Sequence, residues 1–159
     1  MAKSSEHQKP LVILHVEDST ADAELIERLL VREGLVVDIV RVSTREDFLR
    51  GLQQLPIDLI LCDYDFPQFH GLTALELARK RRPDVPFIFV SGFMSDDLAA
   101  ETLRQGAADY LLKDRLARLV PAVRSALREA RIRALVSEPP PAGRGSSPDD
   151  AAADGGEKS

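Results

Sequence analysis

The sequence predicts an α/β fold in which helices cover a parallel β-sheet. Short apolar runs alternate along the chain with longer segments whose apolar residues recur at helical spacing. Strict alternation of this kind is typical of a parallel sheet, because each connection between parallel strands needs room for a helix. We expect five strands at residues 11–16, 35–42, 57–62, 87–90 and 109–113.

Five amphipathic segments predict helices after these strands. The first has a start signal at Ser19 and Thr20 and an end signal at Gly34, since hydroxyl side chains cap helix beginnings and glycine suits helix ends. Proline is tolerated in a first helical turn, so Pro121 predicts that residues 115–119 form a separate turn before the last helix. The other boundaries are Thr44 before the second helix, Gly71 to Arg82 for the third with Pro83 as its stop, and Asp96 and Asp97 opening a fourth that Gly106 closes.

The composition divides the chain into a folded part and two polar ends. Residues 137–159 contain Pro, Gly, Ser, Asp and Ala but no large apolar side chain, so nothing there offsets the entropy of ordering. We therefore expect a flexible N-terminus at residues 1–9, one folded domain at residues 10–136 and a disordered tail at residues 137–159. Such a tail is not expected to hold a second domain.

Charge and cysteine content narrow the class of protein. The net charge of -5 disfavours a surface devoted to nucleic acid, which needs clustered positive charge. Cys62 is the single cysteine, so no internal disulfide can form. The N-terminal residues lack the apolar core of a secretory signal, and no apolar run approaches the roughly 18 residues that a membrane span needs. We expect a soluble, cytoplasmic protein that binds neither DNA nor a membrane.

Polar residues interrupt the pattern at one kind of place, the carboxyl ends of the predicted strands. Glu17 and Asp18 follow the first run, Asp63 the third, Ser91 the fourth, and Lys113 ends the fifth. Ligands of open parallel sheets bind at these ends, where the loops diverge. The sequence therefore predicts that three acids, a hydroxyl and an ammonium meet in one place.

These residue types suit a phosphoryl ligand. The carboxylates of Glu17, Asp18 and Asp63 offer the hard oxygens that Mg²⁺ prefers. Asp63 can then act as a nucleophile toward phosphorus, giving an acyl phosphate. Lys113 would balance charge on the transferred oxygens, and Ser91 would donate a hydrogen bond to one of them. Each residue taken alone is more often a helix cap, a turn residue or a surface lysine, and it is their joint placement that favours a function.

The motifs that carry these residues resemble the receiver domain of response regulators in two-component systems, the family of the chemotaxis regulators. The resemblance covers residues 11 to about 134 and consists of VEDS (16–19), CDYDFPQFHG (62–71), VSG (90–92) and LLKD (111–114). It implies a flavodoxin-like doubly wound sheet of five strands in the order 2-1-3-4-5 with five helices. It also implies that a histidine kinase or a histidine phosphotransfer protein donates a phosphoryl group to Asp63, and that a downstream protein reads the result.

The resemblance assigns a role to each matching residue. Glu17, Asp18 and Asp63 correspond to the Mg²⁺ site, with Asp63 as phosphoacceptor, Ser91 as switch hydroxyl, Lys113 as phosphate-contacting lysine and Tyr110 as switch aromatic. Phosphorylation then changes the surface made by the fourth helix, fifth strand and fifth helix, as a population shift between two states. Asp65 corresponds to the loop position whose backbone carbonyl helps to bind the metal, and we expect its carboxylate to tune dephosphorylation. Receivers of this kind are phosphoacceptors that take part in their own phosphorylation and dephosphorylation, not enzymes.

Several positions depart from the family pattern. Asp114 stands where the family usually has proline, which puts a cis bond after Lys113 in question, and Asp114 is a candidate cap for the following turn. Phe66 and Phe69 stand where methionine is common, and His70 where a small capping residue is common. The stretch after residue 110 resembles receivers that lack a DNA-binding partner domain.

Other interpretations stay open at this point. The chain could be a receiver-fold docking module for which phosphorylation is irrelevant. A flavin binder is disfavoured because VEDSTADAE places acids where the anionic phosphate of the flavin would lie. An aspartyl phosphatase is disfavoured because no suitable second acid-base aspartate follows Asp63 except Asp65. Cys62 is expected to be a buried hydrophobe, and His15 a packed or edge histidine. The arginines near the last helix form either a solvated basic face or an output face for an acidic partner.

Overall fold

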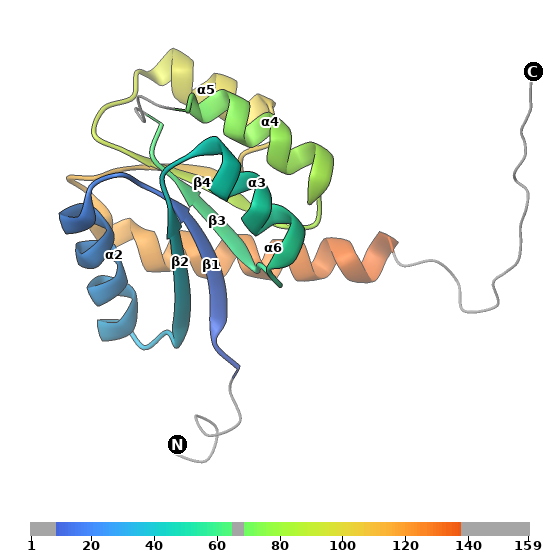
Figure 1. Ribbon diagram of the computed structural model, residues 1–159, viewed down its shortest axis with the longest axis horizontal. Helices are drawn as coiled ribbons and strands as arrows, with labels where there is room; N and C mark the ends of the chain where they lie inside the picture. The colour runs from blue at the N-terminus through green and yellow to red at the C-terminus, as the bar shows by residue number, and fades with distance from the viewer. Residues whose placement is uncertain (1–8, 65–68, 138–159) are drawn as a thin grey trace, which may run out of the picture.

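The structure is a computed structural model, which describes residues 9–64 and 69–137. Five parallel strands form one sheet in the order β2-β1-β3-β4-β5, and helices cover both of its faces (Figure 1). The predicted fold class and strand order are confirmed. The strands are β1 (Leu11–Val16), β2 (Val37–Val42), β3 (Leu59–Cys62), β4 (Phe87–Ser91) and β5 (Asp109–Leu112). The helices are α2 (Thr20–Arg32), α3 (Arg45–Gln54), α4 (Gly71–Arg81), α5 (Asp96–Arg104), the short 3₁₀ helix η1 (Leu116–Arg118) and α6 (Leu119–Ser137).

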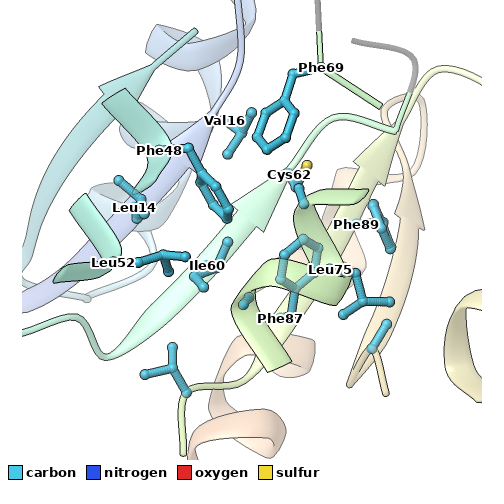
Figure 2. Close-up of a cluster of buried hydrophobic side chains, with 14 of the residues drawn as sticks. Leu14, Val16, Phe48, Leu52, Ile60, Cys62, Phe69, Leu75, Phe87 and Phe89 are labelled. Carbon is cyan, nitrogen blue, oxygen red and sulfur yellow. The ribbon is translucent and has the colours of Figure 1, made fainter. Parts of the chain in front are cut away.

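The two faces of the sheet bury separate apolar clusters. Side chains alternate between the faces along each strand, so Leu14 and Val16 of β1 join one cluster while Ile13 joins the other. The first cluster lies under α3, α4 and α5 and contains tilted aromatic pairs, with the ring centres of Phe87 and Phe89 4.9 Å apart (Figure 2). The second lies under α2 and α6. Burial on both faces explains why the central strands read as continuous apolar runs.

Side-chain caps fix most of the helix beginnings. Ser19, Thr44 and Ser95 each accept a hydrogen bond from the backbone N–H three residues later. His70 caps α4 through Nδ1, which accepts from the Leu72 N–H at 3.1 Å. A histidine therefore does at this position the work of the small capping residue that the family pattern led us to expect.

Two glycines end helices in a backbone conformation that other residues rarely adopt. Gly34 follows α2 with φ of 99°, and Gly106 follows α5 with φ of 114°. At the first of these turns the Leu35 N–H donates to the Leu30 carbonyl, so β2 begins at Val37 and not at residue 35 as predicted.

The segment between β5 and α6 matches one prediction and corrects another. Pro121 lies in the first turn of α6, and η1 is a separate turn before it, as expected. Asp114 does not cap that turn: its cap position is Arg115, which makes no side-chain capping hydrogen bond. No peptide bond within residues 9–64 and 69–137 is cis, so the Lys113–Asp114 bond is trans. The helix α6 ends at Ser137, one residue past the predicted end of the folded part.

Candidate functional site

The candidate site lies where β1, β3, β4 and β5 end. Glu17 follows β1, Asp63 follows β3, Ser91 is the last residue of β4, and Lys113 follows β5. Parallel pairing fixes this arrangement, because Val16 is in register with Cys62 and Ser91 with Leu112. The structure therefore brings together at one edge of the sheet residues that are up to 96 positions apart in the sequence.

Three carboxylates form the acidic part of the site. One oxygen each of Glu17, Asp18 and Asp63 lie within 4.8 Å of one another. Glu17 and Asp63 are buried, whereas Asp18 is exposed. A cluster of hard oxygen donors with one open side fits a small divalent cation that keeps part of its water shell. These are the three carboxylates that the sequence predicted as metal ligands; the fourth predicted ligand, the backbone carbonyl of Asp65, lies outside the described residues.

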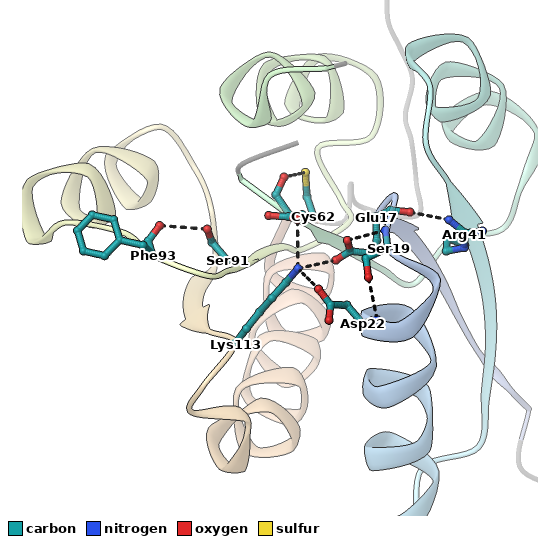
Figure 3. Close-up of polar contacts among 9 residues, drawn as sticks. Glu17, Ser19, Asp22, Arg41, Cys62, Ser91, Phe93 and Lys113 are labelled. Carbon is teal, nitrogen blue, oxygen red and sulfur yellow. Dashed lines mark hydrogen bonds and ion pairs between the residues drawn. The ribbon is translucent and has the colours of Figure 1, made fainter. Parts of the chain in front are cut away.

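Lys113 contacts two of these three carboxylates, and Figure 3 shows its side chain reaching toward Glu17. Its Nζ atom is 3.0 Å from Glu17 Oε1 and 3.1 Å from Asp63 Oδ2. Burial by itself lowers the pKa of Lys113, but the hydrogen bonds to Asp22 and Glu17 outweigh burial and raise that pKa above its ordinary value. The ammonium is therefore charged at neutral pH and offsets part of the repulsion among the acids.

Glu17 is held from several directions. Its Oε2 atom accepts from the Ser19 N–H at 3.0 Å, and its backbone carbonyl accepts from Arg41 Nη1 at 2.9 Å. Burial raises the pKa of Glu17, and the hydrogen bonds from Lys113 and Ser19 oppose that rise. The contact with Arg41 joins the loop after β1 to β2, and sequence reasoning did not find it because an arginine on an edge strand reads as a solvent-facing residue.

Ser91 and Tyr110 occupy the expected elements. The Ser91 hydroxyl is fully buried and donates to the Phe93 carbonyl at 3.1 Å (Figure 3). Tyr110 lies on the edge strand β5, half-buried, and packs against the cluster under α3, α4 and α5. Asp65 and Phe66 lie outside the described residues, so the predictions for the Asp65 carbonyl and carboxylate stay predictions.

Other residues near the site differ in how well the sequence anticipated them. Asp22 was missed: its Oδ2 atom lies 2.7 Å from Lys113 Nζ, the shortest of the three contacts that this lysine makes within residues 9–64 and 69–137. The available signal was its position three residues after the cap Ser19, where an acid faces the beginning of its own helix.

His15 is a packed histidine and not an edge one, since β1 lies between β2 and β3. Cys62 is fully buried, as expected, and burial raises the pKa of its thiol.

A comparison with known protein families decides the relationship. The family model described as the response regulator receiver domain matches residues 13–124, which include every candidate site residue named above. The chain belongs to this family. The receiver prediction made from the VEDS, CDYD, VSG and LLKD motifs is confirmed.

Curated relatives resemble this receiver over part of their length. The chain is 37% identical over 116 residues to the luminescence regulatory protein LuxO of Vibrio campbellii, which covers 72% of this chain and 25% of LuxO. It is 35% identical over 101 residues to the response regulator protein FleR of Pseudomonas aeruginosa, covering 64% of this chain and 21% of FleR. The receiver thus spans about a quarter of the length of the curated relatives that it matches.

Solved structures agree with the fold. The signal receiver domain of a LuxO repressor protein from Vibrio parahaemolyticus superposes with a TM-score of 0.72 at 28% identity, covering 82% of this chain and all of that one (100%). A CheY-like receiver domain from Methanospirillum hungatei gives a TM-score of 0.68 at 28% identity, covering 79% and 99%. Among the helices of the described receiver, none has a stretch long and apolar enough to span a membrane.

Proposed function

We propose that this receiver accepts a phosphoryl group on Asp63 from a histidine kinase or a histidine phosphotransfer protein, and passes the signal on through a change in its surface. The observation that carries the proposal is the contact of the Lys113 ammonium with Asp63, beside the cluster of three carboxylates. A phosphorelay role is also what membership of the receiver family supports.

Each residue has a task in this transfer. A carboxylate oxygen of Asp63 attacks phosphorus, the bond to the donor imidazole breaks, and an acyl phosphate forms. Lys113 balances negative charge on the transferred oxygens. Glu17, Asp18 and Asp63, with the backbone carbonyl of Asp65, would hold Mg²⁺, and the bound ion would supply further charge compensation. The donor set fits the ion, since all three carboxylates are oxygen ligands grouped within 4.8 Å. The protein is in this proposal a phosphoacceptor and not an enzyme.

The switch proposal concerns Ser91 and Tyr110. The Ser91 hydroxyl would leave the Phe93 carbonyl and donate to a phosphoryl oxygen, and Tyr110 would turn inward behind it. The affected surface consists of α5, β5 and α6, and a downstream protein would bind there. A protein partner is favoured over DNA by the net charge of -5, although relatives include proteins named as transcriptional regulators. A cytoplasmic location is also part of the proposal.

Phosphoryl labelling tests the assignment of Asp63. Incubation with Mg²⁺ and acetyl phosphate labelled in its phosphoryl group should label the wild-type receiver and leave Asp63→Ala unlabelled, because the phosphorylated Asp63 carboxylate holds the label and acetate leaves. The matched control is Asp97→Ala, which removes an exposed aspartate on α5 and should label like wild type. Equal labelling of wild type and Asp63→Ala would refute the proposal.

The role proposed for the Asp65 carboxylate has its own test. Asp65→Ala should still be labelled, because the variant keeps its backbone carbonyl, but the lifetime of the acyl phosphate should change by about threefold or more if the carboxylate acts on the attacking water. The lifetime follows from the loss of label after the phosphoryl donor is removed. An unchanged lifetime would contradict this part of the proposal and leave the assignment of Asp63 intact.

A further inference from the structure

Asp22 makes a contact with Lys113 that the transfer chemistry does not use. The two residues are 91 positions apart, and they meet because α2 begins beside the end of β5 (Figure 3). The distance of 2.7 Å from Asp22 Oδ2 to Lys113 Nζ is shorter than the distances from this ammonium to Glu17 and Asp63. Since an ammonium has three N–H donors, these three carboxylates satisfy all of them.

The local structure of α2 leaves the Asp22 carboxylate available for this contact. Asp22 occupies the third position of the helix, and its backbone N–H donates to the Ser19 cap at 3.2 Å. An acid at that position often reaches back to the N–H of the cap residue. Here the Ser19 N–H instead donates to Glu17 Oε2 at 3.0 Å. Glu17 thus takes over the usual partner of Asp22, and the Asp22 side chain holds Lys113.

Asp22 also differs from the other two partners of Lys113 in its relation to the acidic cluster. Within residues 9–64 and 69–137, the grouped carboxylates are Glu17, Asp18 and Asp63, and Asp22 is not among them. A cation bound to the cluster would compete with Lys113 for Glu17 and Asp63 but not for Asp22. Asp22 is therefore the partner that can keep the ammonium when the cluster is filled.

A phosphoryl group on Asp63 would compete with Asp22 for the Lys113 ammonium. The phosphoryl oxygens and the Asp22 carboxylate are both anionic, so each weakens the hold of the other on Lys113, and they also repel one another. The Asp22 side chain is 39% exposed and that of Lys113 21%, so solvent reduces this competition without removing it.

We propose that Asp22 is a positioning residue that retains Lys113 at the beginning of α2 and so limits how tightly the site holds a phosphoryl group. The inference rests on the proposed phosphorylation of Asp63 and adds to it a residue that sets the balance between the two states of the site. Asp22 touches neither the phosphoryl group nor the cluster in this account, and acts only through Lys113.

Binding of beryllofluoride, a phosphoryl mimic, at saturating Mg²⁺ tests the inference. Asp22→Asn keeps the shape of the side chain but removes its charge, so we expect the dissociation constant for beryllofluoride, measured by calorimetry, to fall by about threefold to tenfold. Saturating Mg²⁺ keeps a change in metal affinity out of the result. Asp22→Glu restores a carboxylate and should bind within about twofold of wild type.

A matched control separates the contact from the general loss of charge. Glu24→Gln removes one negative charge from the exposed side of the same helix, and no contact of Glu24 with Lys113 is present in the described part of the chain. We expect this variant to bind beryllofluoride like wild type. Thermal unfolding of each variant shows whether a change reflects the stability of α2 instead.

The role of Asp22 and the proposed phosphorylation of Asp63 are refuted by different results. If wild type binds beryllofluoride and folded Asp22→Asn binds it equally or more weakly, the role of Asp22 is refuted. An equal gain in affinity in Glu24→Gln would refute it too, because the effect would then come from net charge. If wild type itself fails to bind beryllofluoride, the proposed function is refuted.

Discussion

At the scale of one residue, His15 is a buried histidine near the site whose ring nitrogens lack hydrogen-bond partners among the described residues. Its side chain is 1% exposed in the middle of the sheet, and neither ring nitrogen has a hydrogen-bond partner among the described residues. Burial, followed by the nearby charges of Lys113 and Arg41, lowers the pKa of His15 to about 4, while Asp22 opposes that change. A buried polar group without partners destabilises the folded state.

Replacement of His15 by leucine is expected to stabilise the protein, and more so at acidic pH. The pKa of His15 is about 4 in the folded state and 6.5 in the unfolded state. Between these pH values the unfolded state binds more protons than the folded state, so the free energy of unfolding of the wild type decreases as the pH falls from 6.5 to about 4. We expect the free energy of unfolding of His15→Leu to exceed that of the wild type by about 1–2 kcal/mol at pH 7. This difference should grow by up to about 3 kcal/mol toward pH 4. Urea unfolding of both proteins at several pH values measures the difference, and a difference that does not depend on pH would contradict this account.

Lys113 supports a second prediction at the residue scale. Its ammonium lies within 3.1 Å of two of the carboxylates proposed to bind Mg²⁺, so it competes with the metal for Glu17 and Asp63. Lys113→Met should therefore bind Mg²⁺ about tenfold more tightly than wild type at low ionic strength, since the competing charge is gone. Isothermal titration calorimetry measures the affinity. Lys80→Met, which removes an exposed lysine on α4, should leave it unchanged; equal or weaker binding by Lys113→Met would rule out the competition.

At the scale of the element, turns and caps decide where each helix stops. Gly106 follows α5 with φ of 114°, and a Cβ atom there would lie 2.8 Å from Arg79 Nε. Gly92 follows β4 and is the natural comparison, because a Cβ atom there would meet nothing within 4 Å. A change from glycine to alanine is therefore hindered by backbone conformation and by a close neighbour at Gly106, and by neither at Gly92.

Alanine at Gly106 should lower the free energy of unfolding by about 1–2 kcal/mol, mainly because an L-residue is strained at positive φ. Alanine at Gly92 should leave it within about 0.5 kcal/mol of wild type or raise it slightly, since the unfolded chain loses freedom and the folded chain loses nothing. Chemical denaturation measures both. Equal losses at the two positions would show that backbone conformation does not decide the outcome.

At the scale of the whole molecule, the sheet is what assembles the site. The two apolar clusters draw on all five strands, and their residues run from Leu11 to Leu127 in the described part of the chain. The α6 helix extends beyond the sheet to Ser137, where Leu135 and Val136 are exposed (Figure 1). The packing that holds the four contributing loops together is thus complete before the last two turns of α6.

We expect a protein that ends at Ser137 to keep the fold and the site, in agreement with the proposed domain at residues 10–136. Its unfolding temperature should stay within about 2 °C of the full chain, and its affinity for Mg²⁺ and beryllofluoride within about twofold, because every described residue of both clusters is kept. Differential scanning calorimetry and the binding measurements test this. A drop of more than about 5 °C would contradict the domain boundary.

The sequence alone determined the fold class, the strand order through the family resemblance, and the meeting of Glu17, Asp63 and Lys113. This was possible because parallel strands place their carboxyl ends on one edge, so that position along the chain implies position in space. Helix caps depend on residue type within a few positions, and the caps at Ser19 and Thr44 were predicted. The cap at Ser95 was not predicted, although its residue type offered the same signal.

Only the tertiary structure decided which polar side chains act locally and which reach across the fold. Asp22 serves Lys113 and not its own helix end, Asp114 leaves the turn after it uncapped, and Arg41 crosses from β2 to the loop after β1. A carboxylate or guanidinium near a chain reversal has several possible partners of similar strength, and the choice depends on which groups the other strands bring within about 3 Å. That information is absent from any one segment of the sequence and appears when the sheet is complete.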